Sequence, residues 1–241
     1  MSIEVRPVDF ETLGTLREAF RAEADCQIVR DSILPRRLAA PYVVLRDGAV
    51  AAYGGIWLKY FPERVVEFYV LEGFRDGRRA LFEAFLSSTG AKEIEAQTNM
   101  PAMLELLREL GSEPVEEKIL FRDGGPTSPT SPAGWFRRRR AEDEGPEGDW
   151  VVEMDGEVVA GGGMLTHYNP PWADLFMEVA PSWRRRGVGS YLVQELRRVC
   201  REAGLVPAAR CDPDNVASWR TLQRGGMAEC GRLLAASVKG G

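Results

Sequence analysis

Residues 184–190, with the sequence RRRGVGS, stand between an apolar segment and an amphipathic one, and this order limits the folds open to the chain. The apolar residues 175–179 predict a strand, which Pro181 ends. From Val188 to Ala203, apolar residues recur three and four positions apart, which predicts a helix with one buried face. The chain therefore passes from a strand through an Arg/Gly turn into a helix.

This turn has the chemistry of a phosphate site. Its two glycines let a ligand approach the backbone, and the start of a helix offers unpaired N–H groups that favour an anion. Three arginines add planar donors suited to phosphate oxygens. Neither common phosphate loop fits, because Ser190-Tyr191 replaces the Lys-Ser/Thr of a Walker loop and Leu192 replaces the third glycine of a dinucleotide fingerprint. The alternative is an exposed arginine turn that only begins a surface helix.

Two segments carry a family resemblance. Residues 179–189, VAPSWRRRGVG, resemble motif A of the GNAT superfamily of N-acyltransferases, whose loop binds the pyrophosphate of acetyl-CoA through backbone N–H groups. Residues 212–220 with the following Gly225-Gly226-Met227 resemble the family's later Asn-x-x-Ala/Ser helix that ends in Gly-Phe. Both motifs in this order are a specific signature, and the close resemblance covers roughly residues 150 to 235.

The resemblance implies acetyl-CoA as co-substrate and a set of cofactor-binding positions. These are Val179, Arg184, Arg185, Arg186, Gly187, Val188, Gly189, Ser190, Asn215 and Ser218. Val179 could instead be ordinary strand core, and Asn215 an ordinary helix cap. Many family members carry a tyrosine seven residues after the asparagine, where it protonates the departing thiolate. Here that position is Leu222, which cannot donate a proton.

Acyl transfer to an amine also needs a group that takes the amine's proton. Glu178 is the candidate base, because it lies beside Val179 on the predicted strand and its side chain should point to the opposite face. A surface or salt-bridged glutamate is the alternative, and Asp174 is the second candidate. We expect His167-Tyr168 to line the entrance for the acceptor.

These features predict an N-acetyltransferase that moves an acetyl group from acetyl-CoA to a primary amine, on a small molecule or a protein. A non-catalytic acyl-CoA-binding sensor or scaffold is the alternative, and Leu222 favours it. A protein–protein module without a cofactor is a third reading, which the intact Arg/Gly turn opposes. Because positioning alone removes much of a reaction barrier, the missing tyrosine does not exclude catalysis.

Composition limits the remaining classes. The formal net charge of −5 argues against a nucleic-acid partner; residues 135–241 hold fifteen Arg/Lys and fifteen Asp/Glu, so residues 1–134 carry the whole deficit. No apolar run approaches the roughly 20 residues that span a membrane, and the N-terminus lacks a signal peptide, so a cytoplasmic protein without a membrane partner is expected. The four cysteines and one histidine lack the spacing of a metal site, so no metal is expected. A monomer and a homodimer both remain possible.

The chain also repeats itself. An Asp-Gly turn between two apolar strands occurs at residues 42–56 and again at 150–162, and further strands and helices follow in the same order. The expected fold is therefore α/β (α+β), with two tandem GNAT-like units, each a mixed, mostly antiparallel sheet flanked by helices. The second unit is shortened at its start.

The expected domains are a degenerate unit at 1–122, a Pro/Gly/Ser-rich and charged linker at 123–149, and the acetyl-CoA-binding unit at 150–241. In the first unit, the turn at residues 72–79 has no Gly-x-Gly, and it carries two carboxylates where a pyrophosphate would lie. We therefore expect a single cofactor site, in the second unit.

Overall fold

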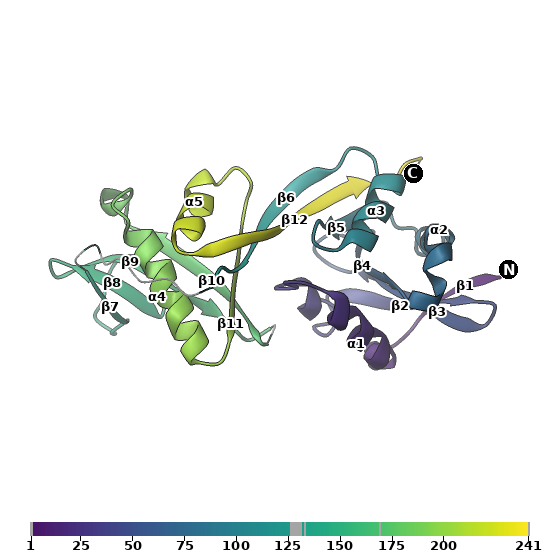
Figure 1. Ribbon diagram of the computed structural model, residues 1–241, viewed down its shortest axis with the longest axis horizontal. Helices are drawn as coiled ribbons and strands as arrows, with labels where there is room; N and C mark the ends of the chain where they lie inside the picture. Colours follow the sequence, from purple (N-terminus) through teal and green to yellow (C-terminus); the bar gives the residue numbers. More distant parts are fainter. Residues whose placement is uncertain (1, 126–131, 133, 169, 241) are drawn as a thin grey trace. The chain divides into compact units, whose positions relative to one another are not determined.

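The computed structural model describes residues 2–125, 132, 134–168 and 170–240, and the chain divides into two compact units (Figure 1). Unit 1 comprises Met1–Glu117 and Gly231–Gly241, and unit 2 comprises Lys118–Cys230. The boundaries fall inside two strands, β6 (Val115–Asp123) and β12 (Met227–Ser237). The expected ranges instead placed 118–122 in the first unit and 231–241 in the second.

Unit 1 is a mixed sheet with helices on both faces. Its strands are β1 (Ile3–Pro7), β2 (Ala39–Arg46), β3 (Ala49–Trp57), β4 (Arg64–Val70) and β5 (Glu93–Gln97), in that order, followed by the second half of β12. Its helices are α1 (Gly14–Glu23), α2 (Arg78–Thr89) and α3 (Pro101–Leu110), with 3-10 turns η1 (Phe10–Leu13), η2 (Arg30–Ser32) and η3 (Glu72–Gly77). Only β4 and β5 run parallel. Neighbouring residues such as Val43 and Val44 enter separate cores, as strand alternation requires.

Unit 2 has a similar sheet but fewer helices. Its strand order is β6, β11 (Val206–Cys211), β10 (Trp172–Val179), β9 (Glu157–Leu165), β8 (Trp150–Met154) and β7 (Trp135–Arg138). Its helices are α4 (Val188–Glu202) and α5 (Val216–Arg224), with the 3-10 turn η4 (Pro181–Trp183). Among the described residues no helix lies between β7 and β8, so the shortened start is confirmed, and the two tandem α/β units are as expected.

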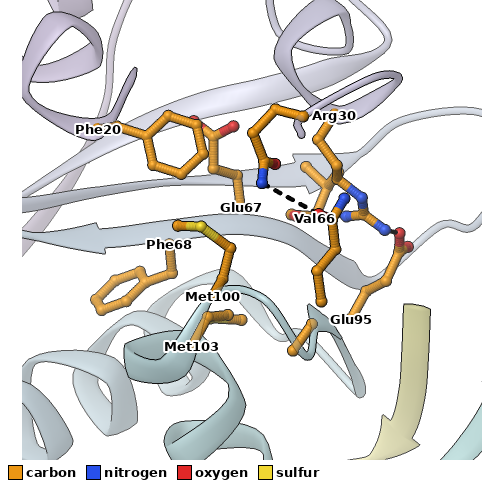
Figure 2. Close-up of a pocket in the computed structure, with 11 residues that line it drawn as sticks. Phe20, Arg30, Val66, Glu67, Phe68, Glu95, Met100 and Met103 are labelled. Carbon is orange, nitrogen blue, oxygen red and sulfur yellow. Dashed lines mark hydrogen bonds and ion pairs between the residues drawn. The ribbon is translucent and has the colours of Figure 1, made fainter. Parts of the chain in front are cut away.

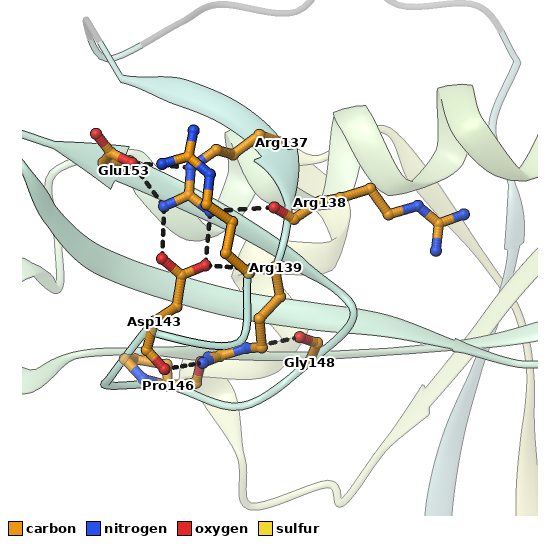
Figure 3. Close-up of polar contacts among 8 residues, drawn as sticks. Arg137, Arg138, Arg139, Asp143, Pro146, Gly148 and Glu153 are labelled. Atoms are coloured by element: carbon orange, nitrogen blue, oxygen red, sulfur yellow. Dashed lines mark hydrogen bonds and ion pairs between the residues drawn. The ribbon is translucent and has the colours of Figure 1, made fainter.

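The segment expected to be a linker is in large part folded. Asp123 ends β6, and residues 135–138 form β7, which pairs with β8. Figure 3 shows Arg137 between two carboxylates, with Nη1 2.6 Å from an oxygen of Asp143 and Nη2 2.6 Å from one of Glu153. The expected linker included this segment, but Arg137 and Arg139 bind partners that sequence spacing does not reveal. The prolines and serines at 126–131 lie outside the described residues.

The loop at residues 139–149 is docked on the sheet. Arg139 donates to the carbonyl oxygens of Asp143, Pro146 and Gly148 (Figure 3). The loop lies so close to β9 that a side chain at Gly161 would overlap the carbonyl oxygens of Pro146 and Glu147. The glycines of β9 are therefore needed for close backbone approach, and the loop takes the place of covering helices on this face.

Arg197 on α4 connects three segments of unit 2. Its side chain is fully buried, and it donates to Asp123 at the end of β6 and to the carbonyl oxygens of Gly125 and Gly225. Burial raises the pKa of the Asp123 carboxyl, but hydrogen bonds from Arg201 and Arg197 outweigh it and hold that pKa below its usual value. The interaction therefore stabilises the fold at neutral pH and is lost only when acid protonates Asp123.

Arg197→Met should lower the free energy of unfolding by about 3 kcal/mol, because buried carbonyl oxygens and a carboxylate lose a charged donor. Urea denaturation followed by tryptophan fluorescence measures the change. The control is Arg198→Met on the same helix, whose half-exposed side chain pairs with the buried Glu195 and the exposed Glu202. It should cost less than about 1 kcal/mol. Equal losses in the two variants would contradict the role given to Arg197.

Gly161→Ala should displace the loop at residues 145–149, because the added Cβ has no room beside the loop backbone. Amide hydrogen exchange in the loop, followed by mass spectrometry, is expected to accelerate. At Gly73 an added Cβ meets no atom within 4 Å, so Gly73→Ala is the matched control and should leave the loop unchanged. Unaltered exchange in Gly161→Ala would show that the loop is not docked as described.

Candidate functional site

The Arg/Gly turn connects β10 to α4 through η4. The backbone of Arg185 and that of Gly187 are both left-handed, with φ of 64° and 84°, and α4 begins at Val188. Gly187 is the N-cap, and its carbonyl oxygen accepts from the Tyr191 N–H at 3.0 Å. The first N–H groups of an α-helix have no acceptor within the helix. The turn therefore presents backbone donors and the positive end of the helix dipole at one place.

Gly189 allows the start of α4 to fit against its neighbours. A Cβ at this position would lie 3.0 Å from Thr221 Cγ2 on α5 and 3.2 Å from Val179 Cγ2 on β10. Gly187 serves a different purpose, because an added Cβ meets nothing within 4 Å and only its backbone conformation favours glycine. The two glycines of the motif are thus required for separate reasons.

A cleft of about 1060 Å³ lies at this turn, between β10, the start of α4 and α5. It is lined by Glu178 and by all the predicted cofactor-binding residues except Arg186 and Val188. The guanidinium of Arg186 lies over the Trp183 ring, 4.9 Å from its centroid, and the Val188 side chain is buried in the core. The Val188 side chain therefore takes no part in lining the cleft.

The arginines that line the cleft differ in the contacts of their side chains. Arg184 Nε donates to the Val179 carbonyl oxygen at 3.1 Å, which fixes the side chain across the end of β10. Arg185 has no ion pair with any described residue. Arg220 and Arg224 also line the cleft, and sequence analysis missed both. Their four-residue spacing on α5 is the signal that could have found them.

Asn215 caps α5, as one of the two readings of the sequence proposed. Its Oδ1 accepts from the Ser218 N–H at 3.0 Å. Both residues also line the cleft, so the cap role and a position beside a cofactor are compatible.

A second cavity opens where β10 and β11 diverge. The two parallel strands pair only from Trp172 to Asp174 with Val206 to Ala208, and beyond this point a slot of about 180 Å³ separates them. The slot is lined by Leu175, Phe176, Met177, Val193, Leu196, Arg210, Ser218 and Leu222. Met177 and Ser218 line both the cleft and the slot, so the two cavities meet there. Leu222 is 2% exposed and brings no hydroxyl to the slot.

The two candidate bases have different surroundings. Glu178 is exposed, lines the cleft and forms no ion pair with a described residue. Asp174 is buried, accepts from the Tyr168 hydroxyl at 2.6 Å and lies 3.4 Å from Arg210 Nε. His167 is exposed and packs edge-on against the Tyr168 ring. Glu178 is therefore the carboxylate with access to a ligand in the cleft.

Unit 1 has a similar divergence of strands, but the opening is filled. Its parallel pair, β4 and β5, is in register only at Arg64–Val65 with Glu93–Ile94. The cavity beyond measures only about 30 Å³. Figure 2 shows Arg30 and Glu95 pointing toward each other there, and they form an ion pair, while Arg30 also donates to the Val66 carbonyl oxygen at 2.6 Å.

A buried carboxylate, that of Glu67, also fills this opening. Glu67 lines the same cavity, accepts from Arg17 and from the Tyr53 hydroxyl at 2.6 Å each, and is buried. Burial raises the pKa of the Glu67 carboxyl, against the opposing charge of Arg17. Charged side chains of unit 1 thus occupy the space that is a slot in unit 2.

Two absences bear on the site. The described residues hold no group of three or more His, Cys, Asp or Glu side chains placed to bind a metal ion. Within the same part of the chain, no helix combines the length and the apolar character that crossing a membrane requires.

Comparisons with known proteins identify a family for residues 113–227 and solved structures of similar fold. Residues 113–227 match the model of the acetyltransferase (GNAT) family. A GNAT-family acetyltransferase from Colwellia psychrerythraea superposes with a TM-score of 0.75 at 14% identity, covering 99% of this chain and 100% of its own. A GCN5-related N-acetyltransferase from Sphaerobacter thermophilus gives a TM-score of 0.59 at 16% identity, covering 99% and 96%.

A tandem GNAT protein from the clavulanic acid biosynthesis pathway also gives a TM-score of 0.59 at 16% identity, covering 98% of each chain. A search of the curated proteins finds no match. At 14–16% identity the solved structures support the fold alone. The family model confirms the resemblance seen in the sequence.

Proposed function

Because residues 113–227 form a GNAT acetyltransferase domain, and thus one of an acyltransferase family, we propose that the chain transfers an acetyl group from acetyl-CoA to a primary amine. The observation that carries the proposal is the junction at Met177 and Ser218, where the cleft beside the Arg/Gly turn meets the slot between β10 and β11. A long cofactor with an anionic middle and a reactive end fits such a pair of cavities.

The pyrophosphate would lie at the start of α4, on the N–H groups that follow Gly187, with Arg184 and Arg185 as charged donors. The pantetheine arm would follow β10. Beyond Asp174 this strand is paired with β9 on one edge only, so backbone groups on its other edge face the opening. An extended amide chain can pair with them as a further strand would.

The thioester would then reach the junction of the two cavities. Glu178 takes one proton from the substrate ammonium, and the resulting amine nitrogen bonds to the thioester carbonyl carbon. The C–S bond then breaks, and the second proton of the nitrogen passes to the departing CoA thiolate. Of the described residues, Met177 and Ser218 are the two that line both the cleft and the slot, and Ser218 is the one with a hydroxyl. We place Ser218 as the hydrogen-bond donor to the departing sulfur, since Leu222 cannot serve.

Charge reversal at Arg184 or Arg185 should weaken acetyl-CoA binding by about 10- to 100-fold, because a hydrogen bond to a charged group is worth about 1.5–3 kcal/mol. Isothermal titration calorimetry with acetyl-CoA measures the loss. Arg186→Glu should weaken binding less, since Arg186 stacks on Trp183 outside the cleft lining. The control, Arg36→Glu with Arg37→Glu, reverses two exposed charges of unit 1 and should leave affinity unchanged. Wild-type affinity in Arg184→Glu and Arg185→Glu would refute the phosphate site.

Glu178→Gln should lower kcat by about 10²- to 10⁴-fold, because the amine loses its proton acceptor while the shape of the site is kept. Release of free CoA from acetyl-CoA across a panel of amines gives the rate, and calorimetry should show nearly unchanged acetyl-CoA affinity. The control is Glu157→Gln at the exposed start of β9. If the variant turns over like the wild type, Glu178 is not the base. If the wild type binds acetyl-CoA but no amine of the panel causes release of CoA, the chain is a sensor.

A further inference from the structure

Arg210 stands at the slot between the diverging strands. It lies two positions beyond Ala208, the last residue of β11 that pairs with β10, and it lines the cavity. Its neighbours Ala209 and Cys211 pack in the core beneath α4, so alternation turns Arg210 to the opposite face of the sheet. On β10, Leu175 enters the same core, while Phe176 lines the slot and is 40% exposed. The slot is thus lined by apolar side chains on the side of α4 and by a charged group on the opposite face of the sheet.

The Arg210 guanidinium is held from one side. Its Nε lies 3.4 Å from Asp174 Oδ2, and the same oxygen accepts from the Tyr168 hydroxyl at 2.6 Å. The Asp174 side chain is only 9% exposed, so it is a fixed anchor. Within the described residues the two terminal Nη groups of Arg210 have no hydrogen-bond partner, and its side chain is 39% exposed. A guanidinium anchored at Nε and open at both Nη groups is arranged to take a planar anion in a bidentate pair.

The remaining walls indicate which anion fits. Leu175, Met177 and Leu222 are apolar, and the Asp174 carboxylate already offsets part of the charge of Arg210. A dianionic phosphate would face one partly neutralised cation, whereas a carboxylate matches it in charge and in fork geometry. The slot's 180 Å³ is more than ten times the roughly 10–15 Å³ that one water needs, so a ligand group has room.

We propose that the slot recognises a substrate carboxylate through the terminal guanidinium of Arg210, and that the acceptor is a small amine bearing this carboxylate. The inference rests on the proposed acetyl transfer. Glu178 and Arg210 both alternate with residues of the core beneath α4, so their side chains share the opposite face of the sheet. On that face an ammonium meets Glu178 and the carboxylate of the same molecule meets Arg210, beside the thioester at Met177 and Ser218. The acceptor class is thus amino-acid-like. The same carboxylate chemistry on the acyl group, as in succinyl-CoA, is the second source that the experiment separates.

The test uses the full-length protein and matched acceptor pairs that differ only in the carboxylate: L-phenylalanine with phenethylamine, and L-lysine with cadaverine. With acetyl-CoA, kcat/KM should be at least about 10-fold higher for the acid of one pair, since a charged hydrogen bond is worth about 1.5–3 kcal/mol. Arg210→Gln should remove this preference, so that the acid and the plain amine of each pair react with equal kcat/KM. Arg210→Lys should restore part of it, because the charge returns without the fork.

A second arm compares succinyl-CoA with acetyl-CoA, using phenethylamine as acceptor. A preference for succinyl-CoA that Arg210→Gln removes would place the carboxylate on the acyl group and overturn the acceptor assignment. Equal rates within every pair and for both thioesters, unchanged in Arg210→Gln, would overturn the role of Arg210 altogether. Arg79→Gln on α2 of unit 1 controls for loss of a surface charge.

Binding separates this inference from the proposed reaction. Calorimetry with CoA-saturated protein compares N-acetyl-L-phenylalanine with its amide, which needs no turnover. Tighter binding of the acid to the wild type, but not to Arg210→Gln, supports the carboxylate site even if no amine is acetylated. In that case the proposed reaction fails and the site stands. If the wild type binds the acid and the amide equally but transfers acetyl groups, the proposed reaction stands and the carboxylate site fails.

Discussion

The parting of two parallel strands is the constraint on which the functional half of this molecule depends. Beyond Asp174 and Ala208, β10 and β11 cease to pair, and each must find other partners for its backbone groups. β11 pairs with β6 through Ala208–Cys211 on its other edge, while the edge of β10 that faced β11 is left bordering a cavity. The slot, the cleft at the Arg/Gly turn and the place of Glu178 all follow from that open edge.

The two units meet this constraint in opposite ways. In unit 1 the corresponding opening is closed by buried charged side chains, with Arg30 paired to Glu95 and Glu67 held by Arg17. Such groups stay buried only when they are paired, so the network excludes a large ligand from this space. In unit 2 the space is lined mainly by apolar side chains, and Arg210 keeps its terminal donors open. One fold thus provides a filled scaffold and an accessible cavity within one chain.

Sequence patterns predicted the local structure well. The strand, the Arg/Gly turn and the helix of unit 2 lie where periodicity and glycine chemistry placed them, and Asn215 caps α5 as its residue type suggested. Contacts between residues far apart in the sequence could not be predicted. Nothing near Asp123 in the sequence indicates that Arg197 and Arg201 bind it, and nothing near Arg137 indicates Glu153. The folded part of the expected linker was therefore missed, because residues outside it, such as Glu153, supply its partners.

The central claim is that a single CoA site exists, at the start of α4. A crystal structure of the protein grown with acetyl-CoA tests it most directly. We expect electron density for the pyrophosphate on the N–H groups that follow Gly187, with the thioester at Met177 and Ser218. We expect no cofactor density at the 3-10 turn Glu72–Gly77 of unit 1. Density at that turn, or an empty cleft beside α4 at saturating acetyl-CoA, would contradict the account.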